Sequence, residues 1–457
     1  MVEFTHLNDR EFRNNLTRVV DDALTIPVST YNSGGLNSVS NPSFFALGDS
    51  PSIDAFARLR VSNPETIFDS KNLYNDADIA DNAENIPLFY DNQEVSGSGT
   101  STSYDPNKAQ QTLVVGASTA GKRIRQTKMR FNYKPGKSQL VLITFNMHGN
   151  DAGIIKQEGL FDDNNGLFLE LNGLDTYLVQ RTFSSGSAVD TKVAQSNWNV
   201  DPFDGTGPSG ITLDFDTTQI LIIDFEWLGV GRVRMGFVVN GLIYYAHNFN
   251  NANNLSVVYM STPNLPLRSA IENDGTGVSS NLSQICCTVI SEGGNTDSGS
   301  IRYASTEGTH VDANTENNVY AIMGIRLKTN YIGASVKIMN AALQLHSATS
   351  KCEWFLVGNP VVAGTFTYVG ESMSACEIAR GATANTVTGG IKFGGGFIES
   401  QGAQSGSSGS QSKGIENAIL LGSAIDGTRD SIVLCIRPIG GSTNVDVEGS
   451  LTWRELQ

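Results

Sequence analysis

The stretch around residues 220 to 249 constrains the fold of this chain most, because it spells three short β-strands in immediate succession. Each run is rich in β-branched and aromatic side chains, which pack well on a pleated sheet. Between the last two runs, Asn240 and Gly241 offer the two positive-φ positions of a type I′ turn, a strong hairpin signal. The stretch therefore predicts an antiparallel meander. Its runs are 220–227, 232–239 and 242–249.

Alternation along the middle run separates an apolar face from a polar one. Val233, Met235 and Phe237 point to one side, and Arg232 and Arg234 to the other. Antiparallel sheets that cover a core on one face and meet water on the other have this pattern. The meander therefore indicates one layer of a β-sandwich with a polar outer face.

The rest of the chain repeats short apolar runs separated by turn residues, with few helical patterns between them. A length of 457 residues exceeds one ordinary core. The linker-like composition of 292–300 places a boundary near 295, and 389–413 is rich in Gly and Ser, which predicts a loop. We expect a mainly β protein with two antiparallel sandwich or jelly-roll-like domains, 54–295 (concanavalin- or jelly-roll-like) and 296–457. Residues 69–118 are polar and show few core-forming positions.

Residues 1–53 are predicted to form a helix followed by an extended arm. Asn8 with Glu11 three residues later resembles a capping box, and the helix is expected over 4–24. An apolar stripe on this helix packs either on its own sheet or on a neighbouring subunit, so it is a candidate docking surface. The stripe comprises Leu16, Val19, Val20, Ala23 and Leu24.

Charge and composition exclude several classes of protein. A formal net charge of -15 argues against a general nucleic-acid binder, since nucleic acids are polyanions. We expect no secretory signal peptide and no membrane insertion, because no apolar run approaches about 20 residues. The five cysteines are scattered, which argues against a disulfide framework or a zinc motif, and Cys352 and Cys435 are expected to be buried.

Asp224 and Glu226 are the best candidate catalytic pair. At a spacing of two on a strand they share a face, roughly 6.5–7 Å apart, which suits paired-acid glycoside chemistry. The third acid of the concanavalin-like glycosidase pattern is missing. The alternative interpretation is two solvated acids on the outer face of a sheet.

Asp162 and Asn164 are candidate metal ligands, because clustered oxygen atoms suit hard cations such as calcium. The same residues, in the run D-D-N-N-G, also make an ordinary hairpin turn. No acid occupies the position where an EF-hand loop would need its last ligand, which is Gly173 here.

A local basic band occurs in this otherwise acidic chain. It could contact phosphate, an anionic glycan or an acidic neighbour, or it could be a solvated strand face. Few aromatic residues interleave with it, which argues against nucleic-acid stacking. The candidate contact residues are Arg123, Arg125, Lys128 and Arg130.

Several segments resemble β-rich virion structural proteins of tailed, largely aquatic bacteriophages. The resemblance implies a virion component that forms a homo-oligomer, with a trimer favoured. The N-terminal helix and arm suit docking to other virion proteins, and the acidic charge and the expected lack of a signal peptide suit assembly in the host cytoplasm. The resemblance implies no catalytic residues and no cofactor, and exposure to a host-surface glycan is compatible with it. The segments are 54–74, 124–147, 159–171, 203–237 and 449–455.

Three functional hypotheses follow. The leading one is a non-enzymatic virion protein, displayed as a capsid decoration or fibre or as a tail-associated adhesion component. The alternative is a β-sandwich that binds or cleaves glycans, with Asp224 and Glu226 as its acids. A weaker alternative is a shell-forming capsid jelly roll.

Overall fold

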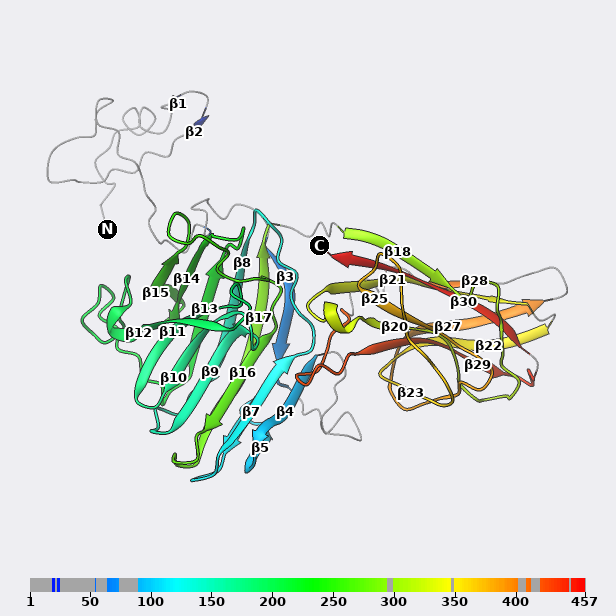
Figure 1. The fold of residues 1–457 in the computed structure, drawn as a ribbon, viewed down its shortest axis with the longest axis horizontal. Coiled ribbons are helices and arrows are strands. Elements are labelled where there is room, and N and C mark those ends of the chain that lie inside the picture. The colour runs from blue at the N-terminus through cyan, green and yellow to red at the C-terminus, as the bar shows by residue number, and fades with distance from the viewer. Residues whose placement is uncertain are drawn as a thin grey trace, which may run out of the picture. The chain divides into compact units, whose positions relative to one another are not determined.

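The computed structural model describes two groups of antiparallel sheets, coloured blue to green and yellow-green to red in Figure 1. Both belong to one compact unit, Asp49–Gln457, and Met1–Gly48 is a separate unit. In the part of the chain that the structure describes, no helix is long and apolar enough to span a membrane. The described residues are 19–20, 23–24, 54, 64–73, 89–293, 299–346, 349–401, 408–411, 420–443 and 445–456.

The first group of strands forms two sheets. One sheet has the order β12 (Val189–Ala194), β11 (Asp175–Thr182), β10 (Gly166–Asn172), β9 (Ile154–Phe161), β16 (Leu267–Asn273), β7 (Gly121–Thr127) and β4 (Tyr90–Gly97). The other has the order β15 (Leu242–Asn250), β14 (Arg232–Val239), β13 (Gln219–Phe225), β8 (Ser138–Asn146), β17 (Ser280–Glu292), β6 (Gln110–Val115) and β5 (Thr100–Asp105), and β3 (Glu65–Lys71) pairs with β17. A short 3-10 helix, η1, spans Gln195–Asn197.

The apolar faces of these two sheets pack into one core, which confirms a sandwich-like first half. Leu169 of β10 and Phe225 of β13 come from opposite sheets and are both fully buried in it. The predicted meander is confirmed as β13, β14 and β15, and Val233, Met235 and Phe237 all face the core. The register places the turn where the sequence indicated it, since Asn240 and Gly241 have φ values of 52° and 78°.

The second group of strands also forms two main sheets. One has the order β18 (Gly299–Ser305), β30 (Asp446–Leu456), β21 (Ser335–Leu345) and β28 (Ser408–Gln411), and β19 (Val311–Asp312) also pairs with β30. The other has the order β24 (Val369–Gly370), β25 (Cys376–Arg380), β20 (Tyr320–Leu327), β29 (Ser431–Ile439), β22 (Thr349–Gly358) and β27 (Ile391–Gln401). A two-stranded ladder joins β23 (Val361–Val362) and β26 (Val387–Thr388), and η2 spans Thr329–Tyr331.

The core of the second half lies between its two main sheets. Trp453 of β30 and Leu434 of β29 come from opposite sheets and are fully buried in the same cluster. The prediction that Cys352 and Cys435 are buried is confirmed, because both side chains have no exposed surface. The change from the first pair of sheets to the second falls between β17 and β18.

Three sequence-based expectations about local structure differ from what is observed. The N-terminal helix is not shown: Val19–Val20 (β1) and Ala23–Leu24 (β2) pair as antiparallel strands, and the rest of the predicted helix, Leu16 included, lies outside the described residues. The predicted loop 389–413 contains β27 and β28. The polar stretch 69–118 contains β4, β5 and β6.

The strand β27 forms despite its glycines because β22 offers a complete pairing partner. Its ladder with β22 runs from Thr349↔Gln401 to Gly358↔Ile391 and shifts register between Phe355 and Leu356. A Cβ atom at Gly395 would lie 2.4 Å from the carbonyl oxygen of Trp354, so glycine permits this close approach.

Glu158 of β9 is an ionisable side chain placed between the two sheets of the first sandwich. Its exposed fraction is 1%, and it accepts a hydrogen bond from the Ser269 hydroxyl at 2.9 Å. Its other oxygen has no hydrogen-bond partner. Burial raises the pKa of Glu158 to about 8, although the Ser269 hydrogen bond and the positive charge of Arg125 act in the opposite direction.

Glu158 should therefore make the stability of the protein pH-dependent. The native state keeps the proton up to about pH 8, whereas the unfolded chain releases it near 4.5, so stability declines as pH rises through that window. The decline is about 1.4 kcal/mol per pH unit at most. Urea unfolding at pH 5 and pH 8 should show a smaller loss of stability in Glu158→Gln than in the wild type. Equal losses in the two proteins would contradict a protonated Glu158.

Candidate functional site

Asp224, the first member of the predicted acid pair, is a buried structural carboxylate. It lies on β13 opposite Arg234 of β14, and neither side chain has any exposed surface. Its Oδ2 atom accepts hydrogen bonds from Arg234 and from the Tyr245 hydroxyl, the latter at 3.0 Å, and its Oδ1 atom accepts one from Ser138 at 2.5 Å. The guanidinium also lies over the Tyr245 ring, 4.4 Å from its centroid.

This arrangement corrects two expectations from the sequence. Arg234 is not on a solvated face, and Asp224 is not a solvated acid, because both are buried at the cross-strand pair. Glu226 is half-buried, and its Oε1 atom accepts a hydrogen bond from the Arg232 backbone N–H at 3.1 Å. A carboxylate that is fully buried and bonded to three protein groups cannot reach a glycosidic bond, so the pair does not form an accessible catalytic site.

Loss of the Asp224 charge should destabilise the protein strongly. Asp224→Asn would leave Arg234 buried without its anionic partner, which costs about 3–5 kcal/mol for buried pairs. Glu226→Gln is the matched control, since a half-buried glutamine can still accept the backbone N–H of Arg232. Chemical denaturation should show a large drop in the midpoint for Asp224→Asn and a small one for Glu226→Gln. Similar midpoints for the two variants would show that the buried Asp224–Arg234 pair contributes little to the free energy of unfolding.

The predicted calcium residues form the turn between β9 and β10. Asp162 Oδ1 accepts hydrogen bonds from the backbone N–H groups of Asn164 and Asn165, each at 2.8 Å, and Oδ2 accepts one from Arg130 at 2.5 Å. Burial works against the charged form, but Arg130 and these N–H groups hold the pKa of Asp162 below its usual range. The protein itself thus satisfies Asp162, and the geometry is that of a hairpin turn.

The predicted basic band is divided among several interior contacts rather than displayed on one solvated face. Arg125 is 2% exposed, stacks on Tyr90 with 3.9 Å to the ring centroid, and donates to Gln284 Oε1 at 2.9 Å. Arg123 is half-buried and donates to Asn92 Oδ1 at 2.9 Å. The remaining two, Lys128 and Arg130, pair with Asp430 and Asp162.

The best candidate binding site is a pocket of about 430 Å³ lined by residues of both sandwiches. Lys128 is one of these lining residues. The first sandwich contributes residues from β4 and from the segment that follows β7. The second contributes the segment after β22 and the loop before β29. The principal lining residues are Asp91, Gln93, Lys128, Asn359, Thr428 and Asp430.

A buried ion pair forms one wall of this junction pocket. Lys128 Nζ lies 3.3 Å from Asp430 Oδ1, and the two side chains are 4% and 3% exposed. The Asn359 amide donates to the same oxygen of Asp430 at 2.7 Å. Asp430 Oδ2 is buried and has no hydrogen-bond partner. Asp430 is therefore a structural carboxylate of the pocket wall, and neither of its oxygens is open to solvent to any extent that would let a ligand reach it.

Asp91 on β4 forms the opposite side of the junction. Its Oδ2 atom accepts hydrogen bonds from the Ile425 backbone N–H at 2.7 Å and from Gln93 at 2.8 Å, and its Oδ1 atom accepts one from the Asn92 N–H at 3.0 Å. Burial raises the pKa of Asp91 above its usual value, although the Ile425 N–H and the charge of Lys128 partly offset this effect. Its hydrogen bonds hold the loop before β29 against β4.

Sequence reasoning had found only Lys128 of this pocket. The other principal lining residues lie on β4 or in turn-like segments, and none of these carries a motif. The Lys128–Asp430 pair is separated by 302 positions. One signal was available, because D-G-T-R-D at 426–430 joins turn residues to charges directly before an apolar strand.

A second pocket, of about 390 Å³, lies within the first sandwich. It is formed by the β10–β11 turn, η1 and the loop near Asp204. Asp175 and Asp204 line it together with the exposed Leu174. Asp204 accepts hydrogen bonds from the Thr206 hydroxyl and backbone N–H at 2.6 and 2.9 Å, and these lower the pKa of Asp204.

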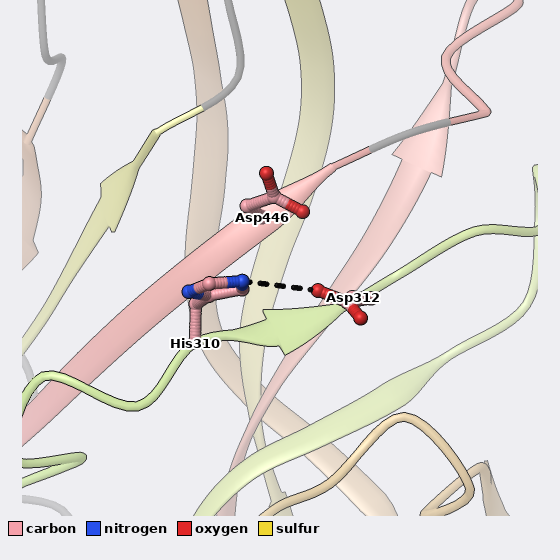
Figure 2. A group of neighbouring side chains, drawn as sticks. All are labelled: His310, Asp312 and Asp446. Carbon is pink, nitrogen blue, oxygen red and sulfur yellow. Dashed lines mark ion pairs between the residues drawn. The ribbon is translucent and has the colours of Figure 1, made fainter.

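A single group of three His, Cys, Asp or Glu side chains lies within ligating distance in the described ranges, and it belongs to the second sandwich. His310, Asp312 and Asp446 point toward one another, as Figure 2 shows. Their ligand atoms all lie within 4.8 Å of one another. These are the residues that could hold a metal ion.

No protein-family profile matches this chain, and no curated protein matches it. Among solved structures, it is similar to a legume lectin-like domain from Entamoeba histolytica (10% identity, 49% of this chain and 97% of that one, TM-score 0.27). It is also similar to a Bacteroides ovatus GH16 protein (9%, 49% and 99%, TM-score 0.32) and to the CBM2 module of the evolved Dit of Lactobacillus casei BL23 phage J-1 (7%, 50% and 95%, TM-score 0.32). Similarity this distant does not carry a ligand or an activity from one chain to another.

Proposed function

We propose that this chain is a carbohydrate-binding protein and that the junction pocket is its binding site. The observation that carries the proposal is the polar lining of that pocket, which gathers amide, hydroxyl and carboxylate groups such as those of Gln93, Thr428 and Asp91. Such groups both donate and accept hydrogen bonds, as the hydroxyl groups of a sugar require. The proposal takes up the glycan-binding alternative in place of the leading virion hypothesis.

The chemistry of the lining favours a neutral ligand with many hydroxyl groups. Gln93 and Asn359 contribute amide groups to the lining, and Thr428 contributes a hydroxyl group. Together with the carboxylate of Asp91, they offer both hydrogen-bond donors and acceptors. The two cationic side chains are already engaged, since Lys128 pairs with Asp430 and Arg429 Nη1 lies 3.0 Å from Glu377. An anionic ligand would therefore meet mainly carboxylates. A volume of about 430 Å³ accommodates the end of an oligosaccharide.

Binding without cleavage is the activity we propose. Asp430 Oδ1 is held by Lys128 and Asn359, and both oxygens of Asp91 accept protein N–H groups. To act as a general acid or a nucleophile, these carboxylates would have to break their hydrogen bonds to the protein and contact the reacting atoms of the sugar instead.

The proposal predicts selective binding on a glycan array that a pocket variant abolishes. Thr428 is exposed, so Thr428→Trp should fill the pocket without disturbing the buried ion pair. We expect affinity for the captured glycan, measured by calorimetry, to fall at least about tenfold in this variant, as expected when a pocket group and its hydrogen bonds are lost. Asp430→Asn should weaken binding too.

Glu399→Gln is the control, because Glu399 is an exposed acid outside the pocket and the substitution removes the same charge as Asp430→Asn. Its affinity should equal that of the wild type. No glycan captured by the folded wild-type protein, or equal affinity in Thr428→Trp, would reject the junction pocket as a carbohydrate site. Product release from a bound oligosaccharide would show cleavage instead of simple binding.

The virion role remains a separate proposal that rests on the resemblance to phage structural proteins. It predicts that the protein is present in purified particles of a phage that encodes it, and that the full-length protein is a homo-oligomer by native mass. Mass spectrometry of such particles tests the first statement directly, and a monomeric native mass would contradict the second.

A further inference from the structure

The group formed by His310, Asp312 and Asp446 belongs to one sheet of the second sandwich, and none of the three residues lines the junction pocket. Asp312 ends β19 and is directly opposite Asp446, the first residue of β30. The His310 ring lies beside both carboxylates in Figure 2, and its Nε2 atom is 3.3 Å from Asp312 Oδ1. Residues directly opposite on neighbouring strands point to the same face, so the register brings the two acids together.

The placement of Asp312 opposite Asp446 brings two carboxylates together, and a bound cation would reduce their repulsion. Like charges directly opposite each other in an antiparallel ladder destabilise it. Apolar or oppositely charged residues would satisfy the same register without that cost. Two carboxylates in this position together with an imidazole are the donor set that first-row divalent ions prefer.

A second imidazole extends the group from the other side of β30. The His346 backbone N–H donates to the Asp446 carbonyl oxygen at 2.9 Å, which places the end of β21 next to Asp446. The rings of His310 and His346 are 6.4 Å apart, and His346 Nε2 lies 3.4 Å from Glu448 Oε1. Two histidines and three acids from three neighbouring chain segments thus converge on one solvent-accessible patch.

We propose that His310, Asp312 and Asp446 bind a zinc-class divalent cation, with His346 as a fourth or outer ligand. Around a tetrahedral zinc ion with bond lengths of 2.0–2.2 Å, the ligand atoms lie roughly 3.3–3.6 Å apart. The ligand atoms of this group all lie within 4.8 Å of one another, and the exposed His310 and Asp312 side chains can rotate to bring them closer. Imidazole donors favour zinc over calcium or magnesium, which prefer oxygen alone.

The bound ion would cross-link neighbouring strands at one end of the five-stranded sheet. It would join β19 to β30 and, through His346, β30 to β21. Ion binding should therefore raise the thermal stability of the protein, because any ligand that binds only the native state stabilises it. This role does not depend on the proposed carbohydrate site.

Calorimetric titration of the metal-free, full-length protein with ZnCl₂ tests the proposal. We expect a site occupied by one ion per chain, with affinity reduced at least about tenfold in His310→Ala and in Asp446→Asn, since even outer partners of metal ligands contribute about 10–100-fold. Zinc should raise Tm in the wild type and leave it unchanged in both variants. All the substituted side chains are at least partly exposed, so the variants should fold, which circular dichroism checks.

Glu399→Gln is again the matched control, because it removes one exposed negative charge from the same sandwich outside the cluster. It should bind zinc as the wild type does. No saturable zinc binding by the wild type, equal affinity in all four proteins, or a preference for CaCl₂ over ZnCl₂ would each overturn the assignment of these residues as a zinc-class site.

Discussion

The fold of the first sandwich depends on the apolar core between its two sheets. The packing of this core also fixes the positions of the polar residues on the same strands. Ile223 of β13 and Met235 of β14 are register partners, and both are buried in the core. Because side chains alternate along a strand, burying this pair fixes the next pair on the opposite face. Asp224 and Arg234 therefore meet as a direct result of packing on the core side.

Burial of charged residues has two different outcomes in this protein. Asp224 and Lys128 each lie beside a buried partner of opposite charge, Arg234 and Asp430 respectively. Glu158, between the sheets, is instead more stable with its proton at neutral pH. Both outcomes avoid an isolated charge in a medium of low polarity, where solvation is lost. In the wall of the junction pocket, Asp430 combines an oxygen that pairs with Lys128 and a second, buried oxygen without a hydrogen-bond partner.

The parts of the fold that could be predicted from sequence depend on local patterns. The meander and its turn at Asn240 are encoded within a few residues, by side-chain alternation and by tolerance of positive φ. The burial of Arg125 could not be predicted, because Tyr90 and Gln284 come from distant strands. The strand β27 was also missed, since its glycines suggest a loop unless the pairing surface of β22 is known.

The sequence by itself determined that the chain folds into antiparallel sheets with apolar faces, since periodicity and turn residues act over short distances. Only the tertiary structure decided which polar residues contact one another. Asp430 meets Lys128 across 302 positions, and His310 meets Asp446 through the register of β19 on β30. Such contacts depend on how distant segments pack, and local pattern contains no information on that packing. For this reason the acids that stood out in the sequence proved structural, and the candidate sites lie elsewhere.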